Sequence, residues 1–439
     1  MIKTLLIANR GEIAVRIIRT CRQMGIKTVA VYSVADADSL HIQLADRSVC
    51  IGPSSTKESY LHMHNIISAA LGTRCDAIHP GVGFLAENSI FASMVEQAGL
   101  IFVGPKAQTI ALLGDKIAAR QAALEAHVPL TPGSTEPIAD FEAARLVARD
   151  LGYPVILKAC GGGGGRGMRI VCSEKELKDA IAIASEEALA FFGNGTILME
   201  KYLHQSRHIE IQLLGDEHRV VSLGERDCTI QKNHQKLIEE SPSPALTSLM
   251  RQQMSRDAIR LLDSIGYKGA GTVEFLVQDG SYYFMEVNAR VQVEHPVTEM
   301  LSTVDLIRQQ LLIASQKPME ISDQLTEYQT HALECRINAL EAGTVEQLTL
   351  PSGPFVRVDS HLYPGYRISP FYDALLAKII VHTPNRQQSI ATMKRALNEL
   401  HIKGIKTNKE EQLQLLKSKE FCSGRFTTDL YERLFQRES

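Results

Sequence analysis

Two carboxylates and an amide fall where a β-hairpin would place them on one face. Alternating apolar residues around a central Asp-Gly turn predict two antiparallel strands within residues 273–290. Glu286, Asn288 and Arg290 are two residues apart, so their side chains are expected on one face, with Glu274 opposite Glu286. Facing carboxylates repel unless a cation lies between them. Because Mg²⁺ prefers oxygen ligands, the hairpin predicts a magnesium site, although bare polar alternation is also typical of a solvated sheet face.

A second feature is a stretch almost without side chains. Five consecutive glycines, 161–165, precede Arg166 and Gly167 and lie between short apolar runs at 153–158 and 168–173. A tight hairpin needs only one or two glycines. We therefore interpret the stretch as a flap whose backbone N–H groups approach an anionic ligand closely, whereas an isolated glycine run would be an ordinary surface loop.

Three lysines lie at the ends of predicted elements. Lys116 belongs to a G-D-K triplet, Lys158 ends the strand before the glycines, and Lys201 belongs to M-E-K-Y-L. Singly, each is typical of a solvated surface. Together with the flap and the magnesium site they predict a nucleotide site, where Lys116 and Lys158 neutralise phosphates and the strand around Lys201 reads adenine with its backbone. The P-loop pattern G-x-x-x-x-G-K-[ST] is absent.

The elements that must position these residues begin with a parallel, doubly wound α/β sheet. In the first hundred residues helical periodicity alternates with apolar strands, which are expected at 3–8, 27–33, 48–52, 75–80 and 100–104. The first turn, A-N-R-G-E-I-A, has one glycine where a dinucleotide site has three, so NAD binding is not predicted. Ligands of such sheets bind at the carboxyl ends of strands, where A-N-R-G-E and H-P-G-V-G-F fall.

The chain of 439 residues is too long for one core, and three domains are expected, at 1–115, 116–330 and 331–439. The second includes a small α+β lid at about 130–203, and the third is β-rich. Hydrophobic residues make up 44% and the net charge is −3, which argues against a nucleic-acid binder. The eight cysteines are scattered without C-x-x-C pairs, and neither a signal peptide nor a membrane-spanning run is seen. A reduced, cytoplasmic protein is expected.

An ordered series of motifs resembles that of the biotin carboxylases. Between residues 7 and 338 the series reads IANRGEIA, HPGVGFLAEN, GDK, GGGGGRGMR, MEKYL, RHIEIQ, ERDCTIQ, HQKLIEESP, GAGTVEFL, EVNARVQVEHPVTE and ECRINA. The resemblance implies an α/β ATP-grasp fold with an N-terminal Rossmann-like domain, a mobile Gly-rich lid and a β-rich C-terminal domain. It also implies ATP- and bicarbonate-dependent carboxylation of biotin, as the first half-reaction of acetyl-CoA carboxylase in fatty-acid synthesis.

The resemblance also implies roles for individual residues. Groups for ATP would be Lys116, Lys158, Gly164, Gly165, Met168, Glu200, Lys201, Tyr202, Leu203, His208, Gln231, His234, Leu276, Glu274 and Glu286. Magnesium or manganese would bind Glu274, Glu286 and Asn288, and bicarbonate would bind Lys236, Arg290, Gln292, Val293 and Glu294. Biotin would meet Arg336, Val82 and Gly83, and the catalytic groups would be Arg290, Glu294, Lys236 and Arg336.

The chemistry of these implied roles is coherent. Bicarbonate is a poor nucleophile, so Glu294 would remove its proton as it attacks the γ-phosphate. The planar fork of Arg290 matches a planar carboxylate. Carboxyphosphate would break down to CO₂ and phosphate, phosphate would take the N1′ proton of biotin, and Arg336 would stabilise the charge on the ureido oxygen. A closing lid would exclude water.

The sequence departs from the family pattern at several positions. Val82 replaces the usual Tyr near the biotin pocket, which puts that contact in doubt, and Lys232 and Asn233 replace two arginines. The segment after E-C-R-I-N-A also lacks the usual acidic residue and proline. The A-M-K-M motif that carries biotin is absent, and Lys394 in A-T-M-K-R-A-L is a poor substitute because it lies in a predicted helix.

The expected partners are therefore a separate biotin carboxyl carrier protein and carboxyltransferase subunits. A homodimer is also implied, with Arg16, Arg19, Tyr366 and Arg367 as interface candidates. Alternatives are the biotin carboxylase subunit of a pyruvate or other acyl-CoA carboxylase, another ATP-grasp ligase, and a regulatory paralogue without catalysis. The bicarbonate motifs argue against an amino-acid ligase, and the complete set of catalytic groups argues against the paralogue.

Overall fold

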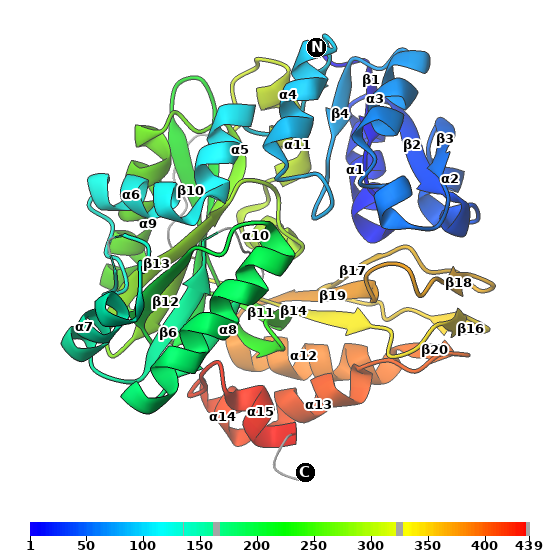
Figure 1. Ribbon diagram of the computed structural model, residues 1–439. Coiled ribbons are helices and arrows are strands. Elements are labelled where there is room, and N and C mark those ends of the chain that lie inside the picture. Colours follow the sequence, from blue (N-terminus) through cyan, green and yellow to red (C-terminus); the bar gives the residue numbers. More distant parts are fainter. Residues whose placement is uncertain (135, 161–166, 322–327, 436–439) are drawn as a thin grey trace.

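The N-terminal region is a parallel sheet with helices on both faces, as predicted (Figure 1). The computed structural model describes residues 1–134, 136–160, 167–321 and 328–435. The strand order is β3-β2-β1-β4-β5, and every neighbouring pair is parallel. Its elements are β1 (Thr4–Ile7), α1 (Gly11–Gln23), β2 (Lys27–Ser33), α2 (Leu40–Leu44), β3 (Arg47–Gly52), α3 (Met63–Gly72), β4 (Ala77–His79), α4 (Ser89–Gln97) and β5 (Ile101–Phe102).

Two helices, α5 (Ala107–Gly114) and α6 (Lys116–Glu125), link the N-terminal region to the lid. The chain turns at Asp115, whose carboxylate accepts the N–H groups of Ile117 and Ala118 and so caps the start of α6. This cap fixes Lys116 at the first position of the second helix.

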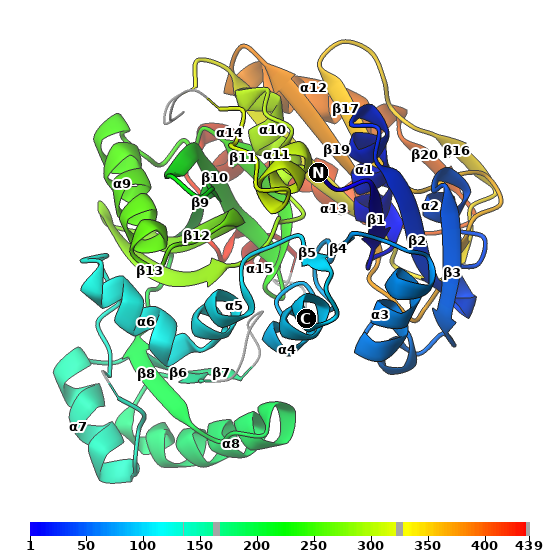
Figure 2. The ribbon, with the colours of Figure 1, turned by 90° about the horizontal axis from the view of Figure 1, so that it is seen from above.

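The predicted lid is a small α/β unit that projects from the body of the molecule (Figure 2). Strand β6 (Val155–Ala159) pairs antiparallel with β7 (Met168–Val171) and β8 (Ile197–Lys201), while α7 (Phe141–Leu151) and α8 (Glu174–Phe192) pack against this sheet. The hairpin prediction is confirmed, because Lys158 lies opposite Met168. The glycines 161–165 of the predicted flap lie outside the described residues.

An eight-stranded sheet runs through the rest of the chain in the order β13-β12-β9-β10-β11-β14-β19-β17. All its neighbours are antiparallel, and the β11–β14 pair joins segments on either side of the domain boundary expected at 330/331. Its strands are β9 (Arg207–Gly215), β10 (Val220–Lys232), β11 (Gln235–Ser241), β12 (Gly269–Gln278), β13 (Ser281–Asn288), β14 (His331–Asn338), β17 (Val356–Ser360) and β19 (Leu375–Thr383).

Helices cover this long sheet, with α9 (Ser248–Ser264) on β9 and β10 and α12 (Arg386–Glu399) on β14 and β19. The other elements are α10 (His295–Ser302), α11 (Leu306–Ala314), β15 (Gly343–Thr344), β16 (Gln347–Thr349), β18 (Arg367–Ile368), β20 (His401–Lys403), α13 (Lys409–Lys417), α14 (Lys419–Ser423) and α15 (Leu430–Phe435). Within the described residues, no helix is both long enough and apolar enough to cross a membrane.

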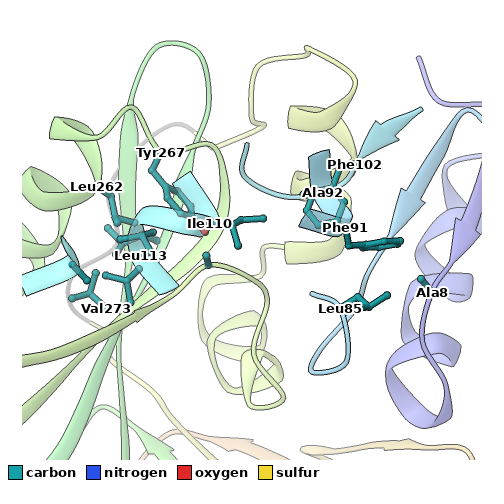
Figure 3. Packing of buried hydrophobic residues seen from close by; sticks show 14 of the residues in the cluster. Ala8, Leu85, Phe91, Ala92, Phe102, Ile110, Leu113, Leu262, Tyr267 and Val273 are labelled. Atoms are coloured by element: carbon teal, nitrogen blue, oxygen red, sulfur yellow. The ribbon is translucent and has the colours of Figure 1, made fainter. Parts of the chain in front are cut away.

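One continuous apolar core joins the N-terminal sheet to the long sheet (Figure 3). Phe91 and Phe102 pack edge to face with ring centroids 6.2 Å apart on the N-terminal side. Leu113 and Val273 belong to the same buried cluster on the other side, and Ile110 of α5 lies between the two groups. Shared burial of this kind couples the positions of the two sheets, so residues from both can define one site.

Arg16, one of the arginines expected at a dimer interface, forms ion pairs within the chain. Arg16 is buried, and its Nη2 lies 2.7 Å from Glu299 Oε1 and 2.8 Å from Asp305 Oδ1. Tyr366 is buried as well, so of the four interface candidates only Arg19 and Arg367 are exposed.

Candidate active site

Lys236 is the centre of a buried cluster of charges. Its Nζ lies 2.6 Å from Glu210 Oε2, 2.8 Å from Glu274 Oε1 and 2.6 Å from Glu294 Oε1. Burial alone would lower the pKa of Lys236, but the three carboxylates outweigh it and hold that pKa well above its usual value. One ammonium group therefore contacts three glutamates that come from three different segments.

A β-bulge brings Lys236 to this face. Strand β10 places Ile230 opposite Ile238 and the next residue, Gln231, opposite Lys236, so Leu237 is an extra residue in β11. Leu237 and Ile238 both lie in the core. In a regular strand without a bulge, Lys236 and Glu239 would point to opposite faces because they are three residues apart. With it, both side chains reach the site.

Glu294 lies between two cations. Its Oε1 meets Lys236, and its Oε2 accepts a hydrogen bond of 2.9 Å from Arg336 Nη2. Burial favours the neutral acid, but Lys236, Arg336 and Arg226 overcome this and hold the pKa of Glu294 well below its usual value. Glu294 is therefore ionised at neutral pH and able to accept a proton.

Arg336 is fixed by a second carboxylate. Its Nε donates to Glu239 Oε1 at 2.6 Å, and Glu239 is fully buried. Arg336 and Glu239 lie on the neighbouring strands β14 and β11, where the register sets Glu239 opposite Glu334. The guanidinium group thus faces Glu294 in a defined orientation.

The hairpin carboxylates pair as the sequence predicts, with Glu274 opposite Glu286 in the β12–β13 register. Glu274 is engaged on both oxygens, by Lys236 and Gln292 on Oε1 and by His208 on Oε2 at 3.1 Å. Burial, and next the charge of Glu274, raise the pKa of Glu286. A divalent cation would relieve this repulsion, so the residues fit a magnesium site that Glu286 shares with Glu274 and the buried Asn288.

Arg290, Gln292 and Val293 follow the hairpin, and each has a polar partner. Arg290 Nη2 donates to Asn288 Oδ1 at 3.0 Å. Gln292 Nε2 donates to Glu274 Oε1 at 2.8 Å, and its Oε1 accepts from the fully buried Arg226 at 2.8 Å. The carbonyl of Val293 accepts a 2.7 Å hydrogen bond from the fully buried Lys378.

The lid lysines lie near further carboxylates. Lys158 contacts Glu200, whose other oxygen accepts from Arg120 Nη1 at 2.6 Å. Lys116 Nζ donates to the carbonyl of Ala159 at 3.1 Å. Burial lowers the pKa of Lys116, and the first opposing cause is the charge of Glu286, which relates this lysine to the predicted metal pair. Lys116 therefore lies within electrostatic reach of Glu286, whereas Lys158 is paired with Glu200.

Other predicted nucleotide groups fall into two sets. His208 contacts Glu274, accepts from Gln231 Nε2 at 2.8 Å under the assigned tautomer, and lies opposite Leu276 in the β9–β12 register. His234, in contrast, is exposed at the β10–β11 turn with a φ of 62°. The structure brings the first three residues together but leaves His234 on the surface.

Backbone N–H groups at the end of the strand expected to bind adenine already donate hydrogen bonds within the lid. The backbone N–H of Lys201 donates to Pro132 O at 2.8 Å, and that of Tyr202 donates to Pro154 O at 3.2 Å. Lys201 Nζ donates to the carbonyl of Gly152 at 2.9 Å. These donors anchor the strand, so adenine recognition by the N–H groups of Lys201 and Tyr202 is not available in this conformation, while Leu203 follows the strand. Gly164 and Gly165 lie outside the described residues.

Val82 and Gly83 lie in the loop after β4. The carbonyl of Val82 accepts a 2.7 Å hydrogen bond from Asn9, and its side chain is half-buried against the cluster that contains Val291. Gly83 is exposed with a φ of 62°. Among the described residues, neither makes a hydrogen bond to Arg336.

Sequence reasoning missed several residues that hold the site together. They are Glu87, Arg120, Glu210, Arg226, Glu239 and Lys378. Glu210 and Arg226 belong to the quoted motifs RHIEIQ and ERDCTIQ, where charged residues lie in strands that are buried along most of their length. Buried charges require partners, which is the signal that could have found them.

Comparisons with known proteins establish the family of the chain. Residues 1–110 match the family "Biotin carboxylase, N-terminal domain", residues 115–322 match "Carbamoyl-phosphate synthase L chain, ATP binding domain", and residues 334–433 match "Biotin carboxylase C-terminal domain". Biotin carboxylase 1 of Bacillus subtilis is 50% identical over 443 residues, which cover 98% of both chains. The chain belongs to the biotin carboxylase family. The biotin carboxylase of Pseudomonas aeruginosa is 48% identical over 97% of this chain and 96% of its own.

Solved structures of biotin carboxylases share the whole fold. A crystal structure of the Campylobacter jejuni enzyme in a complex with β-γ-ATP has a TM-score of 0.96 and 44% identity, covering 99% of each chain. The biotin carboxylase domain dimer of Hydrogenobacter thermophilus 2-oxoglutarate carboxylase, in complex with MgADP, ADP and bicarbonate, has a TM-score of 0.95 and 42% identity over 99% of this chain and 98% of its own. The predicted family and ATP-grasp fold are confirmed, and the chain is a biotin carboxylase, an ATP-dependent ligase.

Proposed function

We propose that this biotin carboxylase uses MgATP and bicarbonate to carboxylate biotin on a separate carrier protein. The observation that carries the proposal is the cluster in which Glu294 lies between Lys236 and Arg336. Proton removal from bicarbonate requires a base, and Glu294 is held as an ionised base between two cations. Lys236 also contacts Glu274 of the predicted metal pair, so the base lies close to the place where a phosphate chain would bind.

In this proposal Lys236 and Arg290 hold bicarbonate while Glu294 removes its proton. The low pKa of Glu294 keeps it ionised but makes it a weak base before bicarbonate binds. A bound bicarbonate would share the charge of Lys236, and the pKa of Glu294 would rise towards the working pH. Base strength would therefore be greatest when the nucleophile is in place.

The nucleotide would lie between the lid and the hairpin. Lys116 and Lys158 would neutralise the phosphates, and Glu286, Glu274 and Asn288 would hold Mg²⁺ or Mn²⁺. When bound, the metal would supply charge neutralisation at the phosphate oxygens. Binding of ATP would draw Lys158 away from Glu200, so the lid would exchange an internal ion pair for one with the ligand.

Arg336 would face the ureido oxygen of biotin after carboxyphosphate has decomposed. Its contacts with Glu239 and Glu294 place the guanidinium beside the base, where charge develops as the biotin nitrogen loses its proton. The biotin would be delivered by a carrier protein, because the A-M-K-M motif is absent from this chain.

We infer acetyl-CoA carboxylase as the complex, with carboxyltransferase subunits and a homodimer of this chain. The B. subtilis and P. aeruginosa relatives, named only as biotin carboxylases, support it, because they match over nearly their full length. A homologous dimer has been solved. Mixing the chain with biotinylated carrier and carboxyltransferase subunits should carboxylate acetyl-CoA, and transfer to pyruvate instead would reject the assignment.

A coupled ATPase assay tests the first half-reaction. Phosphate release by the purified chain should require bicarbonate and should rise when free biotin is added. Lys236→Met should abolish the bicarbonate-dependent rate, whereas Lys268→Met, a change at a partly exposed lysine paired with Glu217, should leave it intact. Equal phosphate release from the wild type in bicarbonate-free buffer would reject the proposal.

A further inference from the structure

Glu87 joins the N-terminal region to the bicarbonate segment. Its Oε2 accepts a 2.8 Å hydrogen bond from Arg290 Nε, and its Oε1 accepts a 2.9 Å hydrogen bond from the backbone N–H of Ala289. Both oxygens therefore hold two consecutive residues that lie 202 and 203 positions further along the chain. The partner positions could not have been inferred from sequence spacing.

These contacts leave one edge of the Arg290 guanidinium available. The group has five N–H donors. Nε donates to Glu87, Nη2 donates to Asn288 Oδ1 at 3.0 Å, and Nη1 donates to the carbonyl of Val291 at 3.3 Å. In the described part of the chain, this leaves one donor on each terminal nitrogen, and a pair of such donors matches a planar carboxylate.

Glu87 also lines a cavity of about 370 Å³ between the start of α4, the α5–α6 junction and the lid. Its lining includes Asp115, Cys160 and Asn194. The Glu87 side chain is 38% exposed and that of Arg290 is 20% exposed, so Glu87 lies at the wall of this cavity and the pair is not part of the core. A carboxylate in this place is more exposed than one that only stabilises a core.

We propose that Glu87 is a positioning residue that orients Arg290 for bicarbonate. The proposal rests on the role of Arg290 given above. Glu87 fixes Nε and the backbone at Ala289, so the terminal nitrogens turn towards the anion. Because Glu87 belongs to the H-P-G-V-G-F-L-A-E-N segment, this contact also makes bicarbonate binding depend on the position of the N-terminal sheet.

The substitution Glu87→Gln tests this role. It keeps an acceptor for Ala289 but removes the charge and turns an amide towards Arg290 Nε. The KM for bicarbonate should rise about tenfold, as expected for loss of one hydrogen bond to a charged group, while the KM for ATP should change less than about twofold. Glu87→Asp, which retains the carboxylate, should recover part of the lost affinity. Glu320→Gln is the matched control, because Glu320 meets Arg308 at 2.8 Å on the surface.

A double-mutant cycle separates positioning from general stability. In the background of Arg290→Lys, which has no Nε donor, Glu87→Gln should have little further effect on the KM for bicarbonate. Thermal unfolding of each variant would reveal a folding defect. If the wild type requires bicarbonate, two results for the single variant Glu87→Gln would overturn the role of Glu87. One is an equal increase in the KM for ATP and for bicarbonate, and the other is an unchanged KM for bicarbonate. Loss of bicarbonate dependence in the wild type itself would instead reject the proposed function.

Discussion

Glu334 should be a carboxylate that lowers stability at neutral pH. It is fully buried in β14, and neither of its oxygens has a hydrogen-bond partner among the described residues. The register sets it opposite Glu239. Burial first, and the charge of Glu239 next, raise the pKa of Glu334 well above its usual value, although Lys378 and Arg336 oppose them and Glu294 adds to them.

The sign of the effect follows from proton linkage. Because the folded state holds the Glu334 proton more tightly than the unfolded chain, wild-type stability falls as pH rises from the unfolded carboxyl pKa towards the folded pKa. The slope for one such group is at most about 1.4 kcal/mol per pH unit. Glu334→Gln removes this titration, so the variant should gain stability over the wild type as pH rises through that window. Near pH 8 the gain should exceed about 1 kcal/mol.

Chemical unfolding of both proteins at pH 5, 6, 7 and 8 measures this difference. Glu225→Gln is the matched control, because Glu225 is also fully buried but accepts from Arg251 Nε at 2.8 Å and from the N–H of Ser243 at 3.0 Å. Removing that charge should destabilise the protein by about 3 kcal/mol. A loss of stability in Glu334→Gln, or a gain that does not grow with pH, would refute the reasoning.

Four further predictions concern the site. Lys236→Met should cost about 3–5 kcal/mol of stability, because three buried carboxylates lose their cation, and an unchanged melting temperature would contradict the described cluster. Glu200→Gln should lower the KM for ATP without changing the KM for bicarbonate, because Lys158 would no longer give up an ion pair with Glu200 to bind phosphate, and an unchanged or raised KM for ATP would argue against that exchange. Val82→Tyr should lower the KM for free biotin several-fold through an added aromatic contact and hydrogen bond worth about 1–2 kcal/mol, with the KM for ATP constant, and an unchanged or raised value in a folded variant would argue against it. Intact-mass analysis and a streptavidin blot should find no biotin on Lys394, and a biotin adduct there would disprove a separate carrier.

The hairpin shows how far local pattern can predict this site. Glu274 and Glu286 lie opposite each other as predicted, but the register that starts at the turn does not give this pair. It sets Phe275 opposite Phe284, and a shift of one residue beyond that pair brings Glu286 opposite Glu274. A second irregularity lies in β11, three strands from β12, where the extra residue Leu237 brings Lys236 to the same face as Glu239. The hydrophobic pattern does not reveal this bulge, because Leu237 and Ile238 are both apolar and both buried.

Contacts between distant segments were also beyond the sequence. The parallel N-terminal sheet was predicted from its alternating strands and helices, but Glu87 meets Arg290 only because a shared core fixes two sheets against each other. The pairing of β11 with β14 across the expected boundary at 330/331 was likewise not predicted. Pairing across a domain boundary depends on tertiary packing, which periodicity does not record.

The contacts of the site have a common physical form. Three of the cations proposed to bind an anion already hold a carboxylate of the chain, namely Lys236 with Glu294, Arg336 with Glu239 and Arg290 with Glu87. A buried cation without a partner would cost several kcal/mol, so the protein needs these pairs before the anions bind. Bicarbonate, ATP and the developing ureido charge would then enter by sharing cations with internal carboxylates. Binding would be an exchange of partners, which limits its net affinity but leaves Glu294 a stronger base at the moment the substrate arrives.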